Sequence, residues 1–318
     1  MAFVLFEKTE IASYTDISAL LCVMKSNSSE DILWKYQLYG NLCWEKHSHI
    51  LYNCGKYDHF SYKEFEDEKR IVLEKLPQNS NWDVVKDYID NGFYILLPIN
   101  TLTLGYTDVP FKHNVFITGY EEELIAVYDY WTPKFMWKYE LIERKNLFNS
   151  IDFSNPDTVQ RIYAFKKNAD YKSSGSNVDI FQLSDTYLKL WSLNCFYNKD
   201  KSIYGDNIYV VMAEYIRNLD EFKLTDCQNM HIVLEHLRFT KNTFEQLYND
   251  NSVICECVSE LNDLVLEVER LRNAVYKYYL SHRKFTNENE FFYNKIINIG
   301  NHERDIKSRI RRLFGNKE

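Results

Sequence analysis

The chain has 318 residues, enough for one large domain or two medium ones, and its 45% hydrophobic and 26% charged residues are ordinary for a globular protein. Its 9 Gly and 5 Pro residues are few, which excludes a disordered scaffold. The formal net charge of −8 is opposite in sign to that of a typical nucleic-acid binder, so we expect no nucleic-acid partner.

Cysteine usage and hydropathy indicate the cellular compartment in which the protein is expected. The 7 cysteines are odd in number and irregularly spaced, without a CxxC motif, so neither a disulfide framework nor a zinc site is indicated. The N-terminus lacks a signal-peptide pattern, and no window of about 18 apolar residues exists. We therefore expect a cytoplasmic protein with no membrane association.

The N-terminal segment predicts mixed structure. Residues 3–6 are apolar and typical of a strand. A helix is predicted next, because four apolar residues recur at helical spacing: Ile17, Leu20, Leu21 and Met24. Thr15 or Asp16 is suited to cap it. Two further helices are predicted over residues 63–76 and 81–91.

From Gly92 the pattern changes to strands. Dense apolar and β-branched segments predict four of them: residues 93–99, 114–118, 124–129 and 134–141. The segment 119–123 between the second and third is a hairpin signal. We expect residues 92–145 to form an antiparallel sheet packed against the helix that follows Ser13.

The C-terminal part is predicted to be helical. Six apolar residues alternate spacings of three and four, as at a helix-bundle interface: Leu261, Leu264, Val268, Leu271, Val275 and Tyr278. We expect a mixed domain over residues 1–150 and a helical domain over residues 151–318. The basic segment 304–317 is typical of a solvated helix face, with docking of an acidic partner as the alternative.

The predicted hairpin contains the residues best suited to chemistry. His113 opens one strand and Asp129 closes the next. A three-residue loop between Gly119 and Glu123 places them opposite each other, whereas an even-membered loop places them on opposite faces unless a bulge restores the match. The sequence does not determine whether the loop has an odd or an even number of residues. If the two meet, the carboxylate fixes the tautomer of an imidazole that acts as a base.

The segment containing this hairpin resembles papain-like proteins related to the N-terminal domain of butirosin biosynthesis protein H and, more distantly, bacteriocin-processing cysteine peptidases. The shared parts are an apolar strand, a strand led by His113, a Gly119-Tyr120 turn and a strand ending at Asp129, within roughly residues 5–145. The resemblance implies a papain-like α+β fold. It also implies an acyltransferase that forms an amide from a carrier-protein thioester and an amine in specialised-metabolite biosynthesis. His113 is then the base and Asp129 its orienter.

The same resemblance expects a nucleophilic cysteine just before the first core helix. Ser13 occupies that place, and backbone N–H groups near Tyr14 would bind the oxyanion. Three interpretations stay open: a working serine nucleophile, an inactive relative that keeps the fold, or a deliberate Cys→Ser replacement made to trap a complex. Cys22, about two helical turns further on, is interpreted as structural, although the sequence does not settle whether it is instead the nucleophile.

The resemblance also defines partners. We expect an acyl or peptidyl carrier protein, with the substrate on its phosphopantetheinyl arm and no other cofactor, and a small-molecule amine acceptor. The helical region would serve docking, acceptor binding or homodimer formation. The alternatives are a non-catalytic binding protein on the same fold and a cysteine peptidase. Histidines gather at positions 47, 49 and 59 near Cys54 and Asp58, but without metal-ligand spacing, so no metal is predicted.

Overall fold

The structure is a computed structural model with two compact units that interleave along the chain. One unit comprises Met1–Lys25 and Phe60–Lys172, and the other comprises Ser26–His59 and Ser173–Glu318. The residues that the structure describes are 2–3, 19–21, 23, 31–32, 35–36, 40–54, 69–77, 80–106, 112–131, 136–153, 155, 158, 162–171, 202–204, 207–248 and 250–315.

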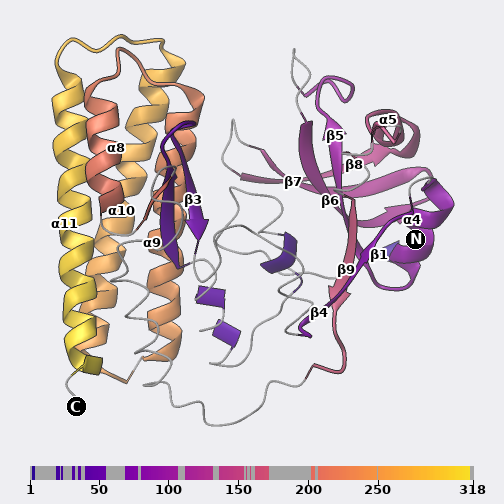
Figure 1. Cartoon of the computed structure of the whole chain (residues 1–318), viewed down its shortest axis with the longest axis horizontal. Coiled ribbons are helices and arrows are strands. Elements are labelled where there is room, and N and C mark those ends of the chain that lie inside the picture. Colours follow the sequence, from indigo (N-terminus) through magenta and orange to yellow (C-terminus); the bar gives the residue numbers. More distant parts are fainter. Residues whose placement is uncertain are drawn as a thin grey trace. The chain divides into compact units, whose positions relative to one another are not determined.

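The first unit is built on a seven-stranded antiparallel sheet (Figure 1). The strand order is β4-β9-β5-β6-β7-β8, and β1 pairs with β6. The strands are β1 (Ala2–Phe3), β4 (Ile71–Lys75), β5 (Tyr94–Asn100), β6 (Lys112–Glu121), β7 (Leu124–Trp131), β8 (Met136–Glu143) and β9 (Tyr163–Lys167). Two helices, α4 (Trp82–Asp90) and α5 (Arg144–Asn149), accompany them.

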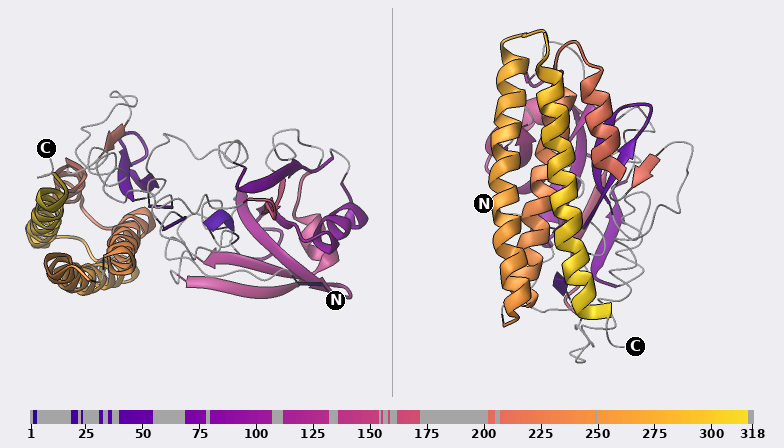
Figure 2. Two further views of the ribbon diagram at one scale, coloured as in Figure 1. Left: turned by 90° about the horizontal axis from the view of Figure 1, so that it is seen from below. Right: turned by 90° about the vertical axis from the view of Figure 1, so that its left-hand side faces the viewer.

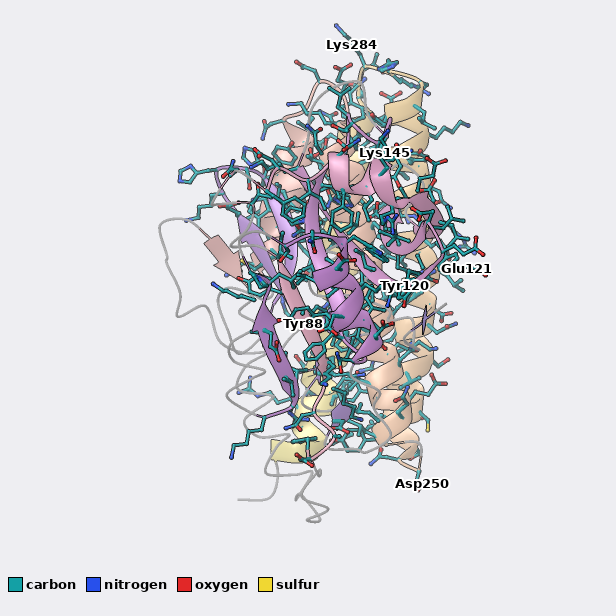
Figure 3. All side chains as sticks on the ribbon, turned by 90° about the vertical axis from the view of Figure 1, so that its right-hand side faces the viewer. Tyr88, Tyr120, Glu121, Lys145, Asp250 and Lys284 are labelled. Carbon is teal, nitrogen blue, oxygen red and sulfur yellow. The ribbon has the colours of Figure 1, made fainter. Side chains whose placement is uncertain are left out.

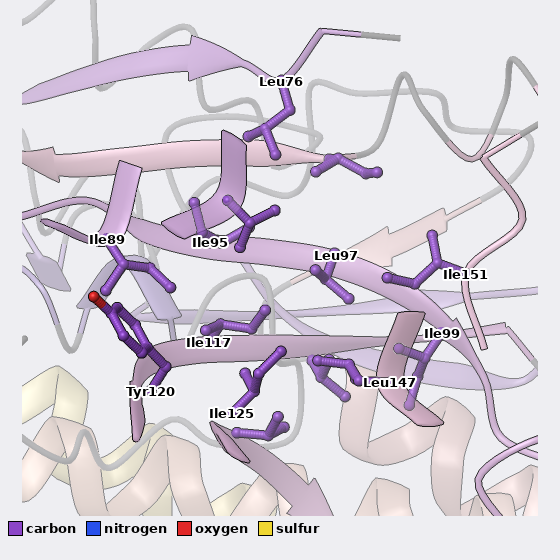
Figure 4. Close-up of a cluster of buried hydrophobic side chains, with 14 of the residues drawn as sticks. Leu76, Ile89, Ile95, Leu97, Ile99, Ile117, Tyr120, Ile125, Leu147 and Ile151 are labelled. Atoms are coloured by element: carbon purple, nitrogen blue, oxygen red, sulfur yellow. The ribbon is translucent and has the colours of Figure 1, made fainter. Parts of the chain in front are cut away.

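One face of this sheet carries the main apolar core of the unit (Figure 4). Alternate side chains of β5 and β6, such as Ile95 and Ile117, pack there with Ile89 of α4 and Leu147 of α5. The opposite face carries a stack of aromatic rings from three neighbouring strands: Tyr94, Phe116 and Phe165. Because β5 is covered on both faces, its sequence is continuously apolar rather than alternating.

Helix α4 begins and ends where the sequence predicts. The Asn81 side chain caps its first turn by accepting a hydrogen bond from the Val84 N–H at 3.2 Å. Gly92, with a φ of 79°, turns the chain into β5 after the helix. At its last turn Asp90 accepts a hydrogen bond from the hydroxyl of Tyr120, which lies at the turn end of the β6–β7 hairpin (Figure 3).

The second unit combines a small sheet with long helices. The sheet is three-stranded and antiparallel, in the order β10 (Ser202–Tyr204), β2 (Asn41–Glu45) and β3 (Ile50–Cys54). The helices are α8 (Asn207–Arg217), α9 (Leu224–Leu247), α10 (Ser252–Leu280) and α11 (Glu288–Gly315). They lie side by side as a bundle (Figure 2). The Asn229 side chain joins the two parts, since it bonds to the Leu51 N–H and the His49 carbonyl.

The bundle contains one very close helix–helix approach. A Cβ atom added to Gly300 of α11 would lie only 2.5 Å from the Cβ of Tyr209 on α8. Glycine therefore lets these two helices pack with their backbones closer than any other residue would allow. On α10, the residues of the predicted apolar seam from Leu261 to Val275 are buried, as expected.

Several expectations are confirmed and others are wrong. The α+β class and the antiparallel sheet within residues 92–145 are confirmed. The helix predicted over residues 63–76 is wrong in its described part, because Ile71–Lys75 is a strand that pairs with β9. Most of the predicted N-terminal helix lies outside the described residues. Its described residues, 19–21 and 23, are helical and buried.

The division at residue 150 also differs from the units observed. Strand β9 follows residue 150 but belongs to the first sheet, where it bridges β4 and β5. The β2–β3 hairpin precedes residue 150 but pairs with β10 of the second unit. After residue 150, the long helices that the structure describes begin at Asn207. No helix in the described part of the chain is long and apolar enough to span a membrane.

Candidate active site

The turn of the β6–β7 hairpin is even-membered. Glu121 pairs with Leu124, which leaves a two-residue turn, and Glu122 in it has a φ of 51°. With a regular ladder, this turn would direct the side chains of His113 and Asp129 to opposite faces of the sheet. The three-residue loop considered from the sequence is therefore not the one that forms.

A β-bulge corrects the register. The ladder shifts by one residue at Thr118, and beyond it Phe116 pairs with Tyr128. Continuing that register makes His113 and Asp129 diagonal neighbours on one face, because a shift of one residue reverses side-chain direction. The bulge is thus the local feature that lets the two side chains meet.

The two side chains are in direct contact. His113 Nε2 and Asp129 Oδ1 lie 2.5 Å apart, so the contact predicted from the sequence is present. The Asp129 side chain is 5% exposed and the His113 side chain 24% exposed. The carboxylate is thus buried while the imidazole reaches the surface. Because Asp129 holds Nε2, proton transfer to a reactant would pass through Nδ1.

Two further polar side chains belong to the same face. The Tyr106 hydroxyl donates a hydrogen bond to Glu140 Oε2 at 2.6 Å. Burial, the bond to Glu140 and the charge of Asp129 together raise the pKa of Tyr106 far above its usual range, so the hydroxyl stays a donor. Neither residue was predictable from the sequence, because each reaches the site only through the strand order.

The residues expected to act with this pair are not described by the structure. Ser13, Tyr14 and Cys22 lie outside the described residues, so their roles stay predictions. The arrangement that is described can orient an imidazole, stabilise the positive charge that it acquires, and accept or return one proton. The described residues thus supply an oriented imidazole next to a buried carboxylate.

The weaker candidates from the sequence are described only in part. Within the described ranges, no group of three or more His, Cys, Asp or Glu side chains could hold a metal ion. The His49 ring stacks on Tyr215 at 4.5 Å between centroids, which is a packing role. His59 and Asp58 lie outside the described residues.

Further histidine–carboxylate pairs lie inside the helix bundle. His231 Nε2 and Glu235 Oε1 lie 3.2 Å apart within α9, and His236 pairs with Glu303 of α11. Glu303 is 1% exposed and contacts three side chains, a set that we call the bundle network. Its partners are His236 Nε2 at 2.7 Å, Lys307 Nζ at 2.7 Å and the Tyr209 hydroxyl at 2.5 Å. Burial alone would raise the pKa of Glu303, but the charge of Lys307 and the contact with His236 hold this pKa far below its usual range.

Part of the basic C-terminal segment is used inside the second unit. Lys307 is directed to Glu303, and Arg309 forms a two-pronged ion pair with Glu260. These two side chains are therefore engaged within the bundle rather than forming a uniform basic face for an acidic partner.

A scan of the chain against models of protein families finds no match, and a search of curated proteins finds no similar sequence.

Proposed function

We propose that the chain is an acyltransferase with a papain-like domain, which takes an acyl group from a carrier-protein thioester and transfers it to an amine. The observation that carries this proposal is the contact between His113 and Asp129, with the carboxylate buried and the imidazole partly exposed. A base oriented in this way is a central requirement of nucleophilic acyl transfer. The family resemblance of the hairpin supplies the choice of reaction.

The proposed reaction has two balanced steps. In the first, His113 takes the proton from the hydroxyl of Ser13 while the Ser13 oxygen attacks the thioester carbonyl. The carrier thiol then leaves with that proton. In the second, His113 takes a proton from the amine as it attacks the acyl ester, and the hydroxyl of Ser13 is restored. N–H groups near Tyr14 would stabilise the oxyanion in both steps.

Labelling with an acyl thioester tests this proposal. The full chain is incubated with an acyl pantetheine thioester, and the covalent adduct is followed by mass spectrometry. We expect Ser13→Cys to form the adduct much faster than the chain as written, because a thiolate is the stronger nucleophile. In that background Asp129→Asn should slow labelling by about 10²–10⁴-fold, since the imidazole loses its orienter.

Cys22→Ala is the matched control and should leave the gain from Ser13→Cys intact. If Cys22→Ala instead abolishes labelling and Ser13→Cys changes nothing, the nucleophile has been misplaced. If no variant forms an adduct although each binds the thioester, the second candidate is favoured. That candidate is a non-catalytic binding protein on the same fold, and the serine at position 13 is the observation in its favour.

A further inference from the structure

The segment between β5 and β6 begins with a tightly bonded turn. The Asn100 side chain accepts a hydrogen bond from the Leu102 N–H at 3.1 Å. The Tyr106 N–H donates a hydrogen bond to the Thr101 carbonyl at 2.8 Å. Gly105, with a φ of 70°, supplies the backbone conformation that this turn needs. The turn 101–106 therefore has a defined shape and presents Tyr106 at its end.

Tyr106 reaches across the sheet. Its hydroxyl bonds to Glu140 of β8, although the turn leaves from the end of β5. Two strands, β6 and β7, lie between β5 and β8. Three strand spacings amount to roughly 14 Å, more than a tyrosine side chain spans, so the turn itself must extend over these strands.

The part of the face that Tyr106 crosses contains Asp129. Glu140 pairs with Val127, which lies two residues before Asp129 on the same face of β7. Tyr106 also packs against the apolar core cluster that includes Val127. After burial and the bond to Glu140, the charge of Asp129 also contributes to the raised pKa of Tyr106. The Asp129 side chain, on β7, is almost fully shielded from water.

We propose that Tyr106 is a positioning residue of the His113–Asp129 pair, and that its hydrogen bond to Glu140 fastens the turn 101–106 over the Asp129 carboxylate. The ring then excludes water from the carboxylate and preserves its contact with His113. This role rests on the proposed acyl transfer, in which an undisturbed bond between Asp129 and His113 orients the base.

The test follows the ring proton shared by His113 and Asp129 in the substrate-free full chain. In protein labelled with ¹⁵N-histidine, NMR measures the exchange of this proton with water. We expect Tyr106→Phe to speed exchange about tenfold, since one hydrogen bond to a carboxylate contributes about 1.4 kcal/mol, which corresponds to a factor of ten. Tyr106→Ala, which removes the cover itself, should broaden the signal beyond detection.

Breaking the same bond from its other end provides the decisive comparison. Glu140→Ala should match Tyr106→Phe, and the double variant should exchange no faster than either single variant. Glu140→Gln keeps an acceptor and should restore slow exchange. Tyr139→Phe is the control, because Tyr139 neighbours Glu140 on β8 but is 49% exposed and points to the other face.

Unchanged exchange in both Tyr106→Phe and Tyr106→Ala would overturn the proposal, as would fully additive effects in the double variant. Amide spectra of each variant establish that the sheet is intact. The measurement needs no substrate, so failure to detect acyl transfer leaves its outcome interpretable. Conversely, a positive labelling experiment with normal exchange in both Tyr106→Phe and Tyr106→Ala would retain the function and reject this role of Tyr106.

Discussion

The two units each contain a histidine bonded to a buried carboxylate, and the pairs differ in what surrounds them. In the first unit, His113 joins Asp129 on a sheet face, and the imidazole is 24% exposed. In the second, His236 joins Glu303 between helices, and both side chains are at most 2% exposed. The chemical groups are equivalent, but of these two pairs only the first has an imidazole that reaches solvent.

The surroundings explain this difference. The Glu303 oxygens already contact Lys307, Tyr209 and His236, so the bundle network satisfies its carboxylate internally. Such a network favours one arrangement of the helices, because each member would be buried without compensation in another arrangement. A histidine–carboxylate pair is therefore evidence for catalysis only together with access, and the comparison predicts opposite responses to mutation.

The largest effect is expected in the bundle network. Glu303→Ala leaves the buried His236 and the largely shielded Lys307 without their carboxylate, and removing one partner of a buried ion pair lowers the free energy of unfolding by about 3–5 kcal/mol. Urea unfolding followed by circular dichroism measures this. Glu256→Ala, at an exposed position of α10, is the control and should change stability by less than about 0.5 kcal/mol.

The dependence of the free energy of unfolding on acidic pH provides a second test of the same variant. The pKa of Glu303 is lowered in the folded state, so its contribution is present at neutral pH and declines as pH falls below the unfolded value of about 4.3. Between about pH 5 and pH 3, Glu303→Ala should therefore lose less stability than the unmodified chain. If both proteins lost stability equally between these pH values, Glu303 would not be held ionised by its partners.

The next effect concerns the close approach of α8 and α11. Gly300→Ala introduces a Cβ 2.5 Å from the Cβ of Tyr209, so the helices must separate and the bundle network must stretch. Overpacking of this kind lowers the free energy of unfolding by about 1–3 kcal/mol, although alanine is the better helix former. Asn301→Ala, at the next and exposed position, is the control and should leave the free energy of unfolding unchanged in the same urea assay. A stabilised Gly300→Ala variant would contradict the close packing.

These contrasts also show how far the sequence alone reaches. The cap at Asn81 and the apolar seam from Leu261 on α10 were predictable, because both depend on residues within one element. The strand β4 was mistaken for a helix because its partner β9 lies about 90 residues further along the chain. Glu303 gave no signal, since its partners come from other helices as well as its own.

The candidate site was predictable in part for the same reason. The order of His113 and Asp129 along two neighbouring strands is visible in the sequence, whereas the bulge at Thr118 that aligns them is not. Neighbouring strands determine where such a bulge forms, so local residue preferences do not place it. Tyr106 was missed because its role depends on a turn that crosses two strands.

The smallest stability effect is expected at the pair proposed for catalysis. His113→Ala opens a partly exposed position, so water can enter and replace the imidazole as a partner of Asp129. We expect the free energy of unfolding to fall by less than about 1 kcal/mol by urea unfolding, while acyl transfer is lost. His236→Ala is the matched substitution in the bundle, where water has no access, and it should lower stability by about 2–4 kcal/mol. Equal losses in the two variants would show that the exposed pair supports the fold as much as the buried one does. The distinction between them, on which the proposed base rests, would then fail.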